Sequence, residues 1–133
     1  MEENLFKVYF VEDNPTETML MRLALQQIKN VEVTFFENGT DLLKKFTESP
    51  SDVVVADLIL PDFHGQELIF QLKKIDKKVK VIVISAQEDV EVIAELQNQD
   101  IFNYIVKSDG CLKYLQKTIQ VACFLIRNEY DFS

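Results

Sequence analysis

The stretch SDVVVADLILPDFHG, residues 51–65, interrupts an otherwise apolar run with an aspartate, Asp57. A run that is apolar on both faces is typical of a strand at the centre of a parallel sheet. A carboxylate buried there is destabilising by several kcal/mol unless a neighbouring group compensates its charge. Taken alone, Asp57 could simply mark the end of a strand. A functional site would need charged or polar groups from other segments that compensate its carboxylate.

Apolar runs of strand length alternate with segments of helical period along the chain. The helix after the first strand has Asn14 as its N-cap, Pro15 in its first position and Glu17 completing a box-like start. Right-handed crossovers then predict an α/β fold, a doubly wound five-stranded parallel sheet with helices on both faces. The expected strands are 5–11, 31–37, 52–56, 79–85 and 101–106, and the expected helices are 14–30, 41–48, 65–75, 88–98 and 110–129.

The composition of the 133 residues predicts one domain over residues 1–133, with 47% hydrophobic residues and a net charge of −8. The negative charge argues against nucleic-acid binding, which needs a basic face. Every apolar run is shorter than the about 20 residues that span a bilayer, and the acidic N-terminus is no signal peptide. We therefore expect a cytoplasmic protein without membrane contact. Cys111 and Cys123 lie in one expected helix, too far apart for a disulfide.

Five polar residues follow or end the expected strands. Glu12 and Asp13 come after the first strand, Asp57 after the third, Ser85 ends the fourth and Lys107 follows the fifth. Adjacent acids are often merely solvated, and a lone lysine or serine at such a place is ordinary. In open α/β sheets, however, sites form at the carboxyl ends of the strands. The shared edge therefore favours one common site.

This set of groups suits phosphoryl transfer. Clustered carboxylates are neutralised by a hard divalent cation, and oxygen ligands with retained waters suit Mg²⁺. A carboxylate such as Asp57 can act as a nucleophile and form an aspartyl-phosphate. Positioning and charge neutralisation are then most of what the reaction needs. Mg²⁺, the Lys107 ammonium and the Ser85 hydroxyl could each take one phosphoryl oxygen.

The sequence closely resembles the receiver domain of two-component response regulators over nearly its whole length. The resemblance rests on VEDNP for the acidic pair, ADLILPDFHGQEL for the phosphoacceptor segment, VIVISA for the hydroxyl and YIVKS for the lysine. It implies a stand-alone CheY-like, flavodoxin-like (βα)5 fold with strand order 2-1-3-4-5.

The resemblance implies Asp57 as phosphoacceptor, with Lys107 and Ser85 as its catalytic partners. Asp13 would bind Mg²⁺ directly, Glu12 largely through water, and the backbone carbonyl of Ile59 would be a further ligand. Ser85 and Tyr104 match the family's switch pair, in which the hydroxyl moves toward the phosphoryl group and the aromatic ring turns inward.

The implied function is signalling by phosphorylation within a two-component system or phosphorelay. A histidine kinase or a histidine phosphotransfer protein would donate the phosphoryl group, and the chain would be no enzyme beyond its own phosphorylation and dephosphorylation. The output would be a changed protein-binding surface on the fourth helix, fifth strand and fifth helix, with homodimerisation left open. The last helix supports this surface because four apolar residues lie outside its core stripe of Leu112, Leu115, Ile119, Ala122 and Ile126: Tyr114, Val121, Phe124 and Leu125.

Several positions depart from the family pattern or stay without a role. Ser108 stands where the family usually has proline, often after a cis bond, so the loop into the last helix is expected to differ. Ser85 replaces the commoner threonine and keeps the hydroxyl. His64 is expected to be exposed, and Ile59 and Gln87 are expected to border the phosphoryl group.

Three other functions compete with this interpretation. A phosphatase of the haloacid dehalogenase type needs a second aspartate two residues after the nucleophile, and this chain has Ile59 there. A flavodoxin-like electron carrier needs a small-residue phosphate loop after the first strand, and VEDNPTETML contains no glycine. The third alternative is a degenerate receiver that acts as an interaction module independent of phosphorylation.

Overall fold

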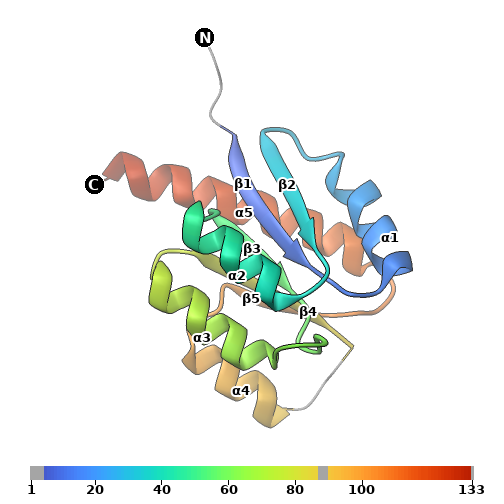
Figure 1. Cartoon of the computed structure of the whole chain (residues 1–133). Coiled ribbons are helices and arrows are strands. Elements are labelled where there is room, and N and C mark those ends of the chain that lie inside the picture. Colours follow the sequence, from blue (N-terminus) through green and yellow to red (C-terminus); the bar gives the residue numbers. More distant parts are fainter. Residues whose placement is uncertain (1–4, 87–89, 133) are drawn as a thin grey trace.

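The computed structural model describes residues 5–86 and 90–132, with side chains through residue 128. Within them, parallel strands form one sheet in the order β2-β1-β3-β4-β5, which confirms the expected order (Figure 1). The strands are β1 (Phe6–Val11), β2 (Val31–Phe36), β3 (Val53–Ala56), β4 (Lys80–Ser85) and β5 (Asn103–Val106).

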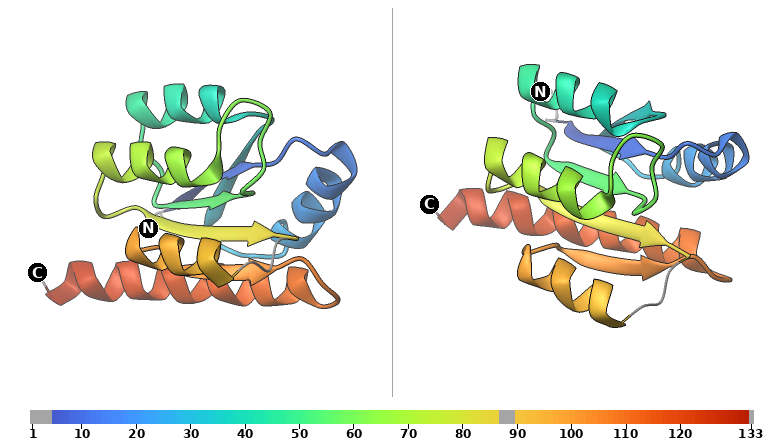
Figure 2. Two further views of the ribbon diagram at one scale, coloured as in Figure 1. Left: turned by 90° about the horizontal axis from the view of Figure 1, so that it is seen from below. Right: turned by 60° about the horizontal axis from the view of Figure 1, so that its bottom comes forward.

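Helices cover both faces of the sheet, as expected for a doubly wound fold. Helices α1 and α5 pack on one face and α2, α3 and α4 on the other (Figure 2). Their bounds are α1 (Pro15–Leu25), α2 (Gly39–Glu48), α3 (Gly65–Ile75), α4 (Val90–Asn98) and α5 (Cys111–Phe132). No helix among the described residues is long and apolar enough to cross a bilayer.

The central strand β3 supplies both halves of the core. Val53 and Val55 pack with α1 and α5, whereas Val54 and Ala56 pack with the helices of the other face. This division follows from the pleat, because successive side chains of a strand point to opposite faces. The unbroken apolar run before Asp57 is therefore what a strand covered on both sides requires.

Helix α1 ends at Leu25, so the expected helix over 14–30 extends five residues too far at its C-terminal end. The chain tightens there into turns, with the Ile28 N–H donating to the Leu25 carbonyl at 3.1 Å. Asn30 then adopts φ 65°, a left-handed conformation that asparagine tolerates better than most residues. Its carbonyl accepts from the Phe6 N–H at 2.9 Å, which ties this turn to the start of β1.

The other helix bounds are close to expectation. Helix α3 has the expected bounds, and α2 begins two residues earlier than expected, with Asn38 capping it by accepting from the Asp41 N–H at 2.8 Å. Helix α5 extends to Phe132, beyond the expected end at 129. The expected start of the fourth helix at residue 88 lies outside the described residues, which resume with α4 at Val90.

The predicted two-sided character of α5 is confirmed. Leu115, Ile119 and Ala122 are buried, and Leu112 and Ile126 pack against the same core. The four apolar residues expected outside this stripe are exposed: Tyr114, Val121, Phe124 and Leu125. The two cysteines are free thiols, as expected, and burial raises the pKa of the Cys123 thiol to about 11.

Candidate functional site

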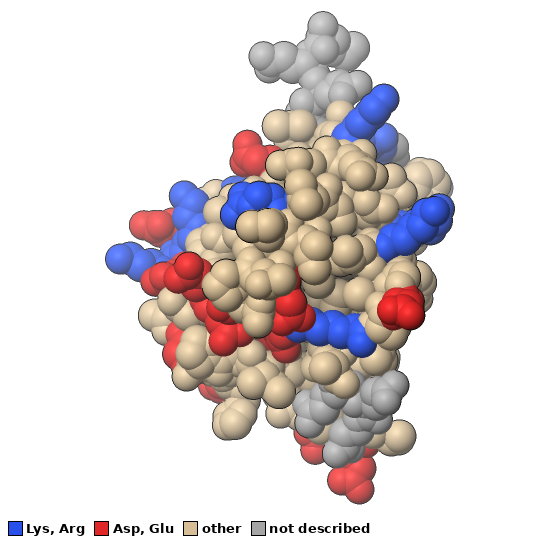
Figure 3. Space-filling view, turned by 90° about the vertical axis from the view of Figure 1, so that its right-hand side faces the viewer, with Lys and Arg blue, Asp and Glu red and all other residues tan. Residues whose placement is uncertain are grey.

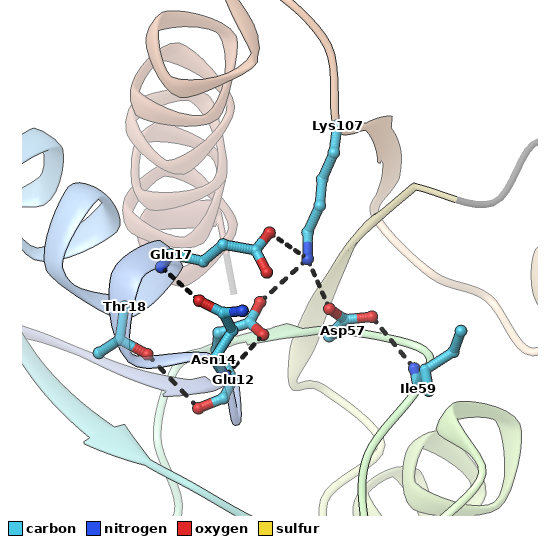
Figure 4. A network of polar contacts seen from close by, with 7 residues as sticks. All are labelled: Glu12, Asn14, Glu17, Thr18, Asp57, Ile59 and Lys107. Atoms are coloured by element: carbon cyan, nitrogen blue, oxygen red, sulfur yellow. Dashed lines mark hydrogen bonds and ion pairs between the residues drawn. The ribbon is translucent and has the colours of Figure 1, made fainter.

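The carboxyl edge of the sheet holds the predicted site. The hydrogen-bond ladder continues one residue past β3 and β5, with the Asp57 N–H donating to the Val11 carbonyl at 3.3 Å and the Lys107 N–H to the Ser85 carbonyl at 2.8 Å. Glu12 follows β1 directly and precedes α1 in the chain. The backbone thus brings three charged side chains together, and Figure 4 shows them pointing toward one another.

The Lys107 ammonium is the centre of this network. Its Nζ lies 2.6 Å from Asp57 Oδ2, 3.1 Å from Glu12 Oε1 and 2.7 Å from Glu17 Oε1 (Figure 4). A lysine ammonium has three N–H donors, so three carboxylates match its full capacity. On the face seen in Figure 3, acidic side chains gather beside basic ones. One cation therefore neutralises part of a strongly acidic edge.

Burial strengthens these contacts. The exposed side-chain fraction is 1% for Glu12, 10% for Asp57 and 16% for Lys107. Burial raises the pKa of Glu12 to about 7, against the opposing influence of Lys107 and the Asn14 N–H. Burial acts against the charge of Lys107 as well, but its hydrogen bonds to Asp57 and Glu17 outweigh it, so the pKa of Lys107 is raised. A second cation at this edge would favour the ionised form of Glu12.

Backbone N–H groups orient the remaining carboxylate oxygens. The Ile59 N–H donates to Asp57 Oδ1 at 3.0 Å, and the Asn14 N–H donates to Glu12 Oε2 at 3.2 Å. Glu17 was expected to complete the capping box by accepting from Asn14, and this expectation is wrong. Because Glu12 accepts that N–H, the Glu17 carboxylate is available to Lys107, while Asn14 Oδ1 still caps α1 by accepting from the Glu17 N–H at 3.0 Å.

Glu17 is the residue of this site that sequence reasoning missed. Its signal was present, because it lies in the first turn of the helix that leaves the carboxyl end of β1. A side chain one turn into that helix can reach the same edge as the residues that end the strands. Glu17 was assigned to the cap of the helix, and its reach to the site was therefore not considered.

The loop after Asp57 depends on a close backbone contact. Gly65 donates its N–H to the Leu58 carbonyl at 2.9 Å, and a Cβ at position 65 would lie 2.7 Å from the Leu58 Cα. Only glycine avoids that clash. The same loop carries Asp62, whose carboxylate accepts from the backbone N–H of Gly39 at 2.9 Å and of Thr40 at 2.8 Å, at the start of α2.

The other predicted site residues lie at or near this edge. Ser85 is buried at the end of β4, and Asp13 is exposed after β1. Tyr104 is partly buried in β5 and packs against the core beneath α2, α3 and α4. The Ile59 side chain is exposed beside Asp57. Gln87, which we expected to border the phosphoryl group, lies outside the described residues.

Two expectations about single residues can be compared with the structure. His64 is exposed, as expected, and it makes no side-chain cap at the start of α3. The described peptide bonds are all trans, so Lys107–Ser108 is trans where the family often has a cis bond before proline. The loop then passes through Gly110, with φ +83°, into α5. These differences leave the charged groups of the edge in place.

The site has the donor chemistry for Mg²⁺, although its carboxylates do not form a closed cage. Among the described residues, no three His, Cys, Asp or Glu side chains are grouped closely enough to hold a metal ion. Mg²⁺ keeps several waters and is usually bound through one or two carboxylates, so a closed cage is not required. The residues that could hold it are Glu12, Asp13, Asp57 and the Ile59 carbonyl.

Known proteins resemble this chain along most of its length. The sequence model of the response regulator receiver domain matches residues 8–120. Chemotaxis protein CheY of Listeria monocytogenes is 29% identical over 120 residues, which cover 85% of this chain and 98% of that protein. The DNA-binding transcriptional regulator NtrC of Escherichia coli is 27% identical over 100 residues, covering 75% of this chain and 21% of that regulator. The chain thus spans about a fifth of the length of NtrC.

Solved structures resemble the fold. The signal receiver domain of a putative Luxo repressor protein from Vibrio parahaemolyticus has a TM-score of 0.89 at 19% identity, over 97% of this chain and 98% of that one. Response regulator DrrB of Thermotoga maritima has a TM-score of 0.77 at 27% identity, over 93% of this chain and 54% of that one. The sequence match includes every residue of the charged edge. The chain therefore belongs to the response regulator receiver domain family of two-component signalling.

Proposed function

We propose that the chain accepts a phosphoryl group on Asp57 from a histidine kinase or a histidine phosphotransfer protein. The observation that supports this most directly is the buried contact of 2.6 Å between Lys107 Nζ and Asp57 Oδ2. It places a fixed positive charge beside the carboxylate that would react, where charge develops during phosphoryl transfer.

In this reaction an Asp57 carboxylate oxygen attacks the phosphorus, the phosphorus–nitrogen bond of the donor phosphohistidine breaks, and the histidine leaves with the bond's electron pair. The Ile59 N–H orients Asp57 through its contact of 3.0 Å with Oδ1. The Lys107 ammonium offsets the charge of the arriving phosphoryl oxygens. Bound Mg²⁺ would supply further charge neutralisation, held by Glu12, Asp13, Asp57 and the Ile59 carbonyl.

The output of phosphorylation is a change in protein binding on α4, β5 and α5. The exposed apolar residue Tyr114 of α5 supports this surface, because it is 52% exposed and its hydroxyl accepts from the Asn103 side chain of β5 at 3.1 Å. Ser85 and Tyr104 would couple phosphorylation of Asp57 to this surface. Ser85 ends β4, Tyr104 lies in β5, and the backbone contact between Ser85 and Lys107 joins β4 to the end of β5. A downstream protein or a second copy of the chain would bind there.

The experiment is incubation with Mg²⁺ and acetyl phosphate, followed by intact-protein mass spectrometry. The wild type should gain the mass of one phosphoryl group, and the gain should disappear with EDTA or in Asp57→Asn. Asp62→Asn serves as a matched control, since Asp62 lies in the same loop and outside the proposed site. A wild type that stays unmodified would favour the alternative, a degenerate receiver that binds its partners without phosphorylation.

A further inference from the structure

Three carboxylates surround the Lys107 ammonium before any phosphoryl group arrives. Glu12 and Asp57 accept hydrogen bonds from it at 3.1 and 2.6 Å, and Glu17 forms an ion pair with it at 2.7 Å. A phosphoryl oxygen on Asp57 therefore meets an ammonium, with three N–H donors, that already has three carboxylate neighbours. One of the three carboxylates must give way for Lys107 to bind the phosphoryl group.

The three acceptors differ in how easily they can leave. Glu12 is 1% exposed, so its carboxylate cannot turn into water if it loses the contact with Lys107. Asp57 carries the phosphoryl group itself and stays beside Lys107. Glu17 has 34% of its side chain exposed and lies in the first turn of α1, where its carboxylate can turn into water. Glu17 is the acceptor that leaves at the lowest free-energy cost.

We propose that Glu17 competes with the phosphoryl group for the Lys107 ammonium and so limits how fast Asp57 is phosphorylated. This inference rests on the proposed function of Asp57. Glu17 is a positioning residue here, because it acts through Lys107 and contacts neither Asp57 nor the donor. Its contribution opposes the reaction, since its contact with Lys107 must be exchanged before the new one forms.

The first test compares Glu17→Gln with Glu67→Gln. Glu67 occupies the same place in the first turn of α3 and is exposed, so this control matches the loss of net charge and of a charge near a helix N-terminus. With acetyl phosphate at saturating Mg²⁺, Glu17→Gln should raise the phosphorylation rate about two- to fivefold, the range of a partly exposed ion pair. Glu67→Gln should leave the rate unchanged, and equal rates in the two variants would overturn the inference.

The second test asks whether the effect passes through Lys107. In a double-mutant cycle, Glu17→Gln should lose its acceleration when Lys107→Met is also present. If the acceleration persists in Lys107→Met, Glu17 acts only by repelling the anionic donor, and the inference fails. Should Lys107→Met not fold, Lys107→Arg replaces it, because the five N–H donors of arginine can serve Glu17 and a phosphoryl oxygen together. The ratio of phosphorylation rates with and without Glu17→Gln should then fall toward one. A ratio in Lys107→Arg as large as in the wild-type background would contradict competition.

The failure of this inference is distinguishable from the failure of the proposed function. A wild type that gains no phosphoryl group overturns both. A wild type that is phosphorylated on Asp57, with Glu17→Gln behaving like Glu67→Gln, overturns the competition at Lys107 alone.

Discussion

Two lysines at opposite edges of the sheet have nearly the same exposure and opposite pKa shifts. Lys107, at the carboxyl edge, has 16% of its side chain exposed, and Lys73, near the amino ends of β4 and β5, has 18%. Burial lowers the pKa of Lys73, and Asp100, at 4.0 Å, does not offset it. Burial acts in the same direction on Lys107, yet the pKa of Lys107 is raised.

The difference lies in the partners of each ammonium. Lys73 donates to the Val79 carbonyl at 2.8 Å, and its acidic neighbour Asp100 is 96% exposed. Lys107 contacts carboxylates that are themselves partly or fully buried. The amino edge has more lysines, with Lys73, Lys77, Lys78 and Lys80 lining a hollow of about 220 Å³. The raised pKa of Lys107 therefore depends on contacts with carboxylates at hydrogen-bond distance and shielded from water. The number of lysines at an edge does not produce it.

The largest loss of stability should come from replacing Lys107, with the replacement of Lys73 as its comparison. Lys107→Met should lower the free energy of unfolding by about 3 kcal/mol, because it leaves the buried Glu12 carboxylate without its counter-charge. Lys73→Met should lower it by about 1 kcal/mol or less, since one hydrogen bond to a carbonyl is lost. Urea denaturation at pH 8 without added Mg²⁺ measures both. Equal losses would show that burial alone, rather than pairing, distinguishes the two edges.

A smaller loss of stability should follow when a Cβ is added to Gly65, at the end of the loop after Asp57. Gly65→Ala should lower the free energy of unfolding by about 2 kcal/mol, because the new Cβ meets the Leu58 backbone. Gly110→Ala is the control, since no atom beyond its chain neighbours lies within 4 Å of the place its Cβ would occupy and only its φ of +83° is unfavourable. We expect about 1 kcal/mol there. Thermal or urea unfolding in which Gly65→Ala is as stable as wild type would contradict the close contact.

Asp62 tests whether an exposed carboxylate at the carboxyl edge contributes through hydrogen bonds. Slight burial acts against its charge, but its bonds from Thr40 and Gly39 outweigh this, so the pKa of Asp62 is lowered from 3.8. A lowered carboxyl pKa adds stability above the unfolded-state value, and this is lost as the pH falls through the folded-state value. Asp62→Ala should therefore be destabilised by about 1 kcal/mol at neutral pH. The difference from wild type should shrink below pH 3.8 in urea titrations at several pH values; a constant difference would argue for a packing effect.

The smallest effect is expected at the amino edge. Asp100→Asn should change the free energy of unfolding by less than about 0.5 kcal/mol, because an exposed ion pair contributes little. Asp62→Ala provides the contrast, as both aspartates are exposed and only Asp62 accepts backbone N–H bonds. A loss in Asp100→Asn as large as in Asp62→Ala, measured by the same urea series, would remove the distinction between the two edges.

Much of the fold was predictable because local and global signals agree. Helix α3 has the expected bounds, since its apolar spacing, its preceding loop and Gly65 all indicate the same start. The Asn14 cap is confirmed, with its side chain accepting from the Glu17 N–H. The end of α1 was not predicted, because residues 26–30 contain no glycine or proline, and the left-handed turn at Asn30 is held by its contact with β1.

The sequence predicted which edge of the sheet the residues of the candidate site share, but not how deeply each side chain is buried there. Glu12, Asp57, Ser85 and Lys107 follow or end strands that the pattern identifies, so the edge they share follows from topology. The unequal burial of the adjacent acids Glu12 and Asp13 does not follow from it, since only the packing of β1 against its neighbours separates an enclosed side chain from an exposed one.

The order of residues alone determined a five-stranded doubly wound sheet and the edge where its charged groups meet, because hydrophobic periodicity and crossover handedness are properties of the chain itself. Tertiary structure alone decided that Glu17 reaches Lys107 and that Asp62 caps α2. Both contacts join segments far apart in sequence through flexible polar side chains. Their partners are selected by distance and exclusion of water, which no local pattern encodes.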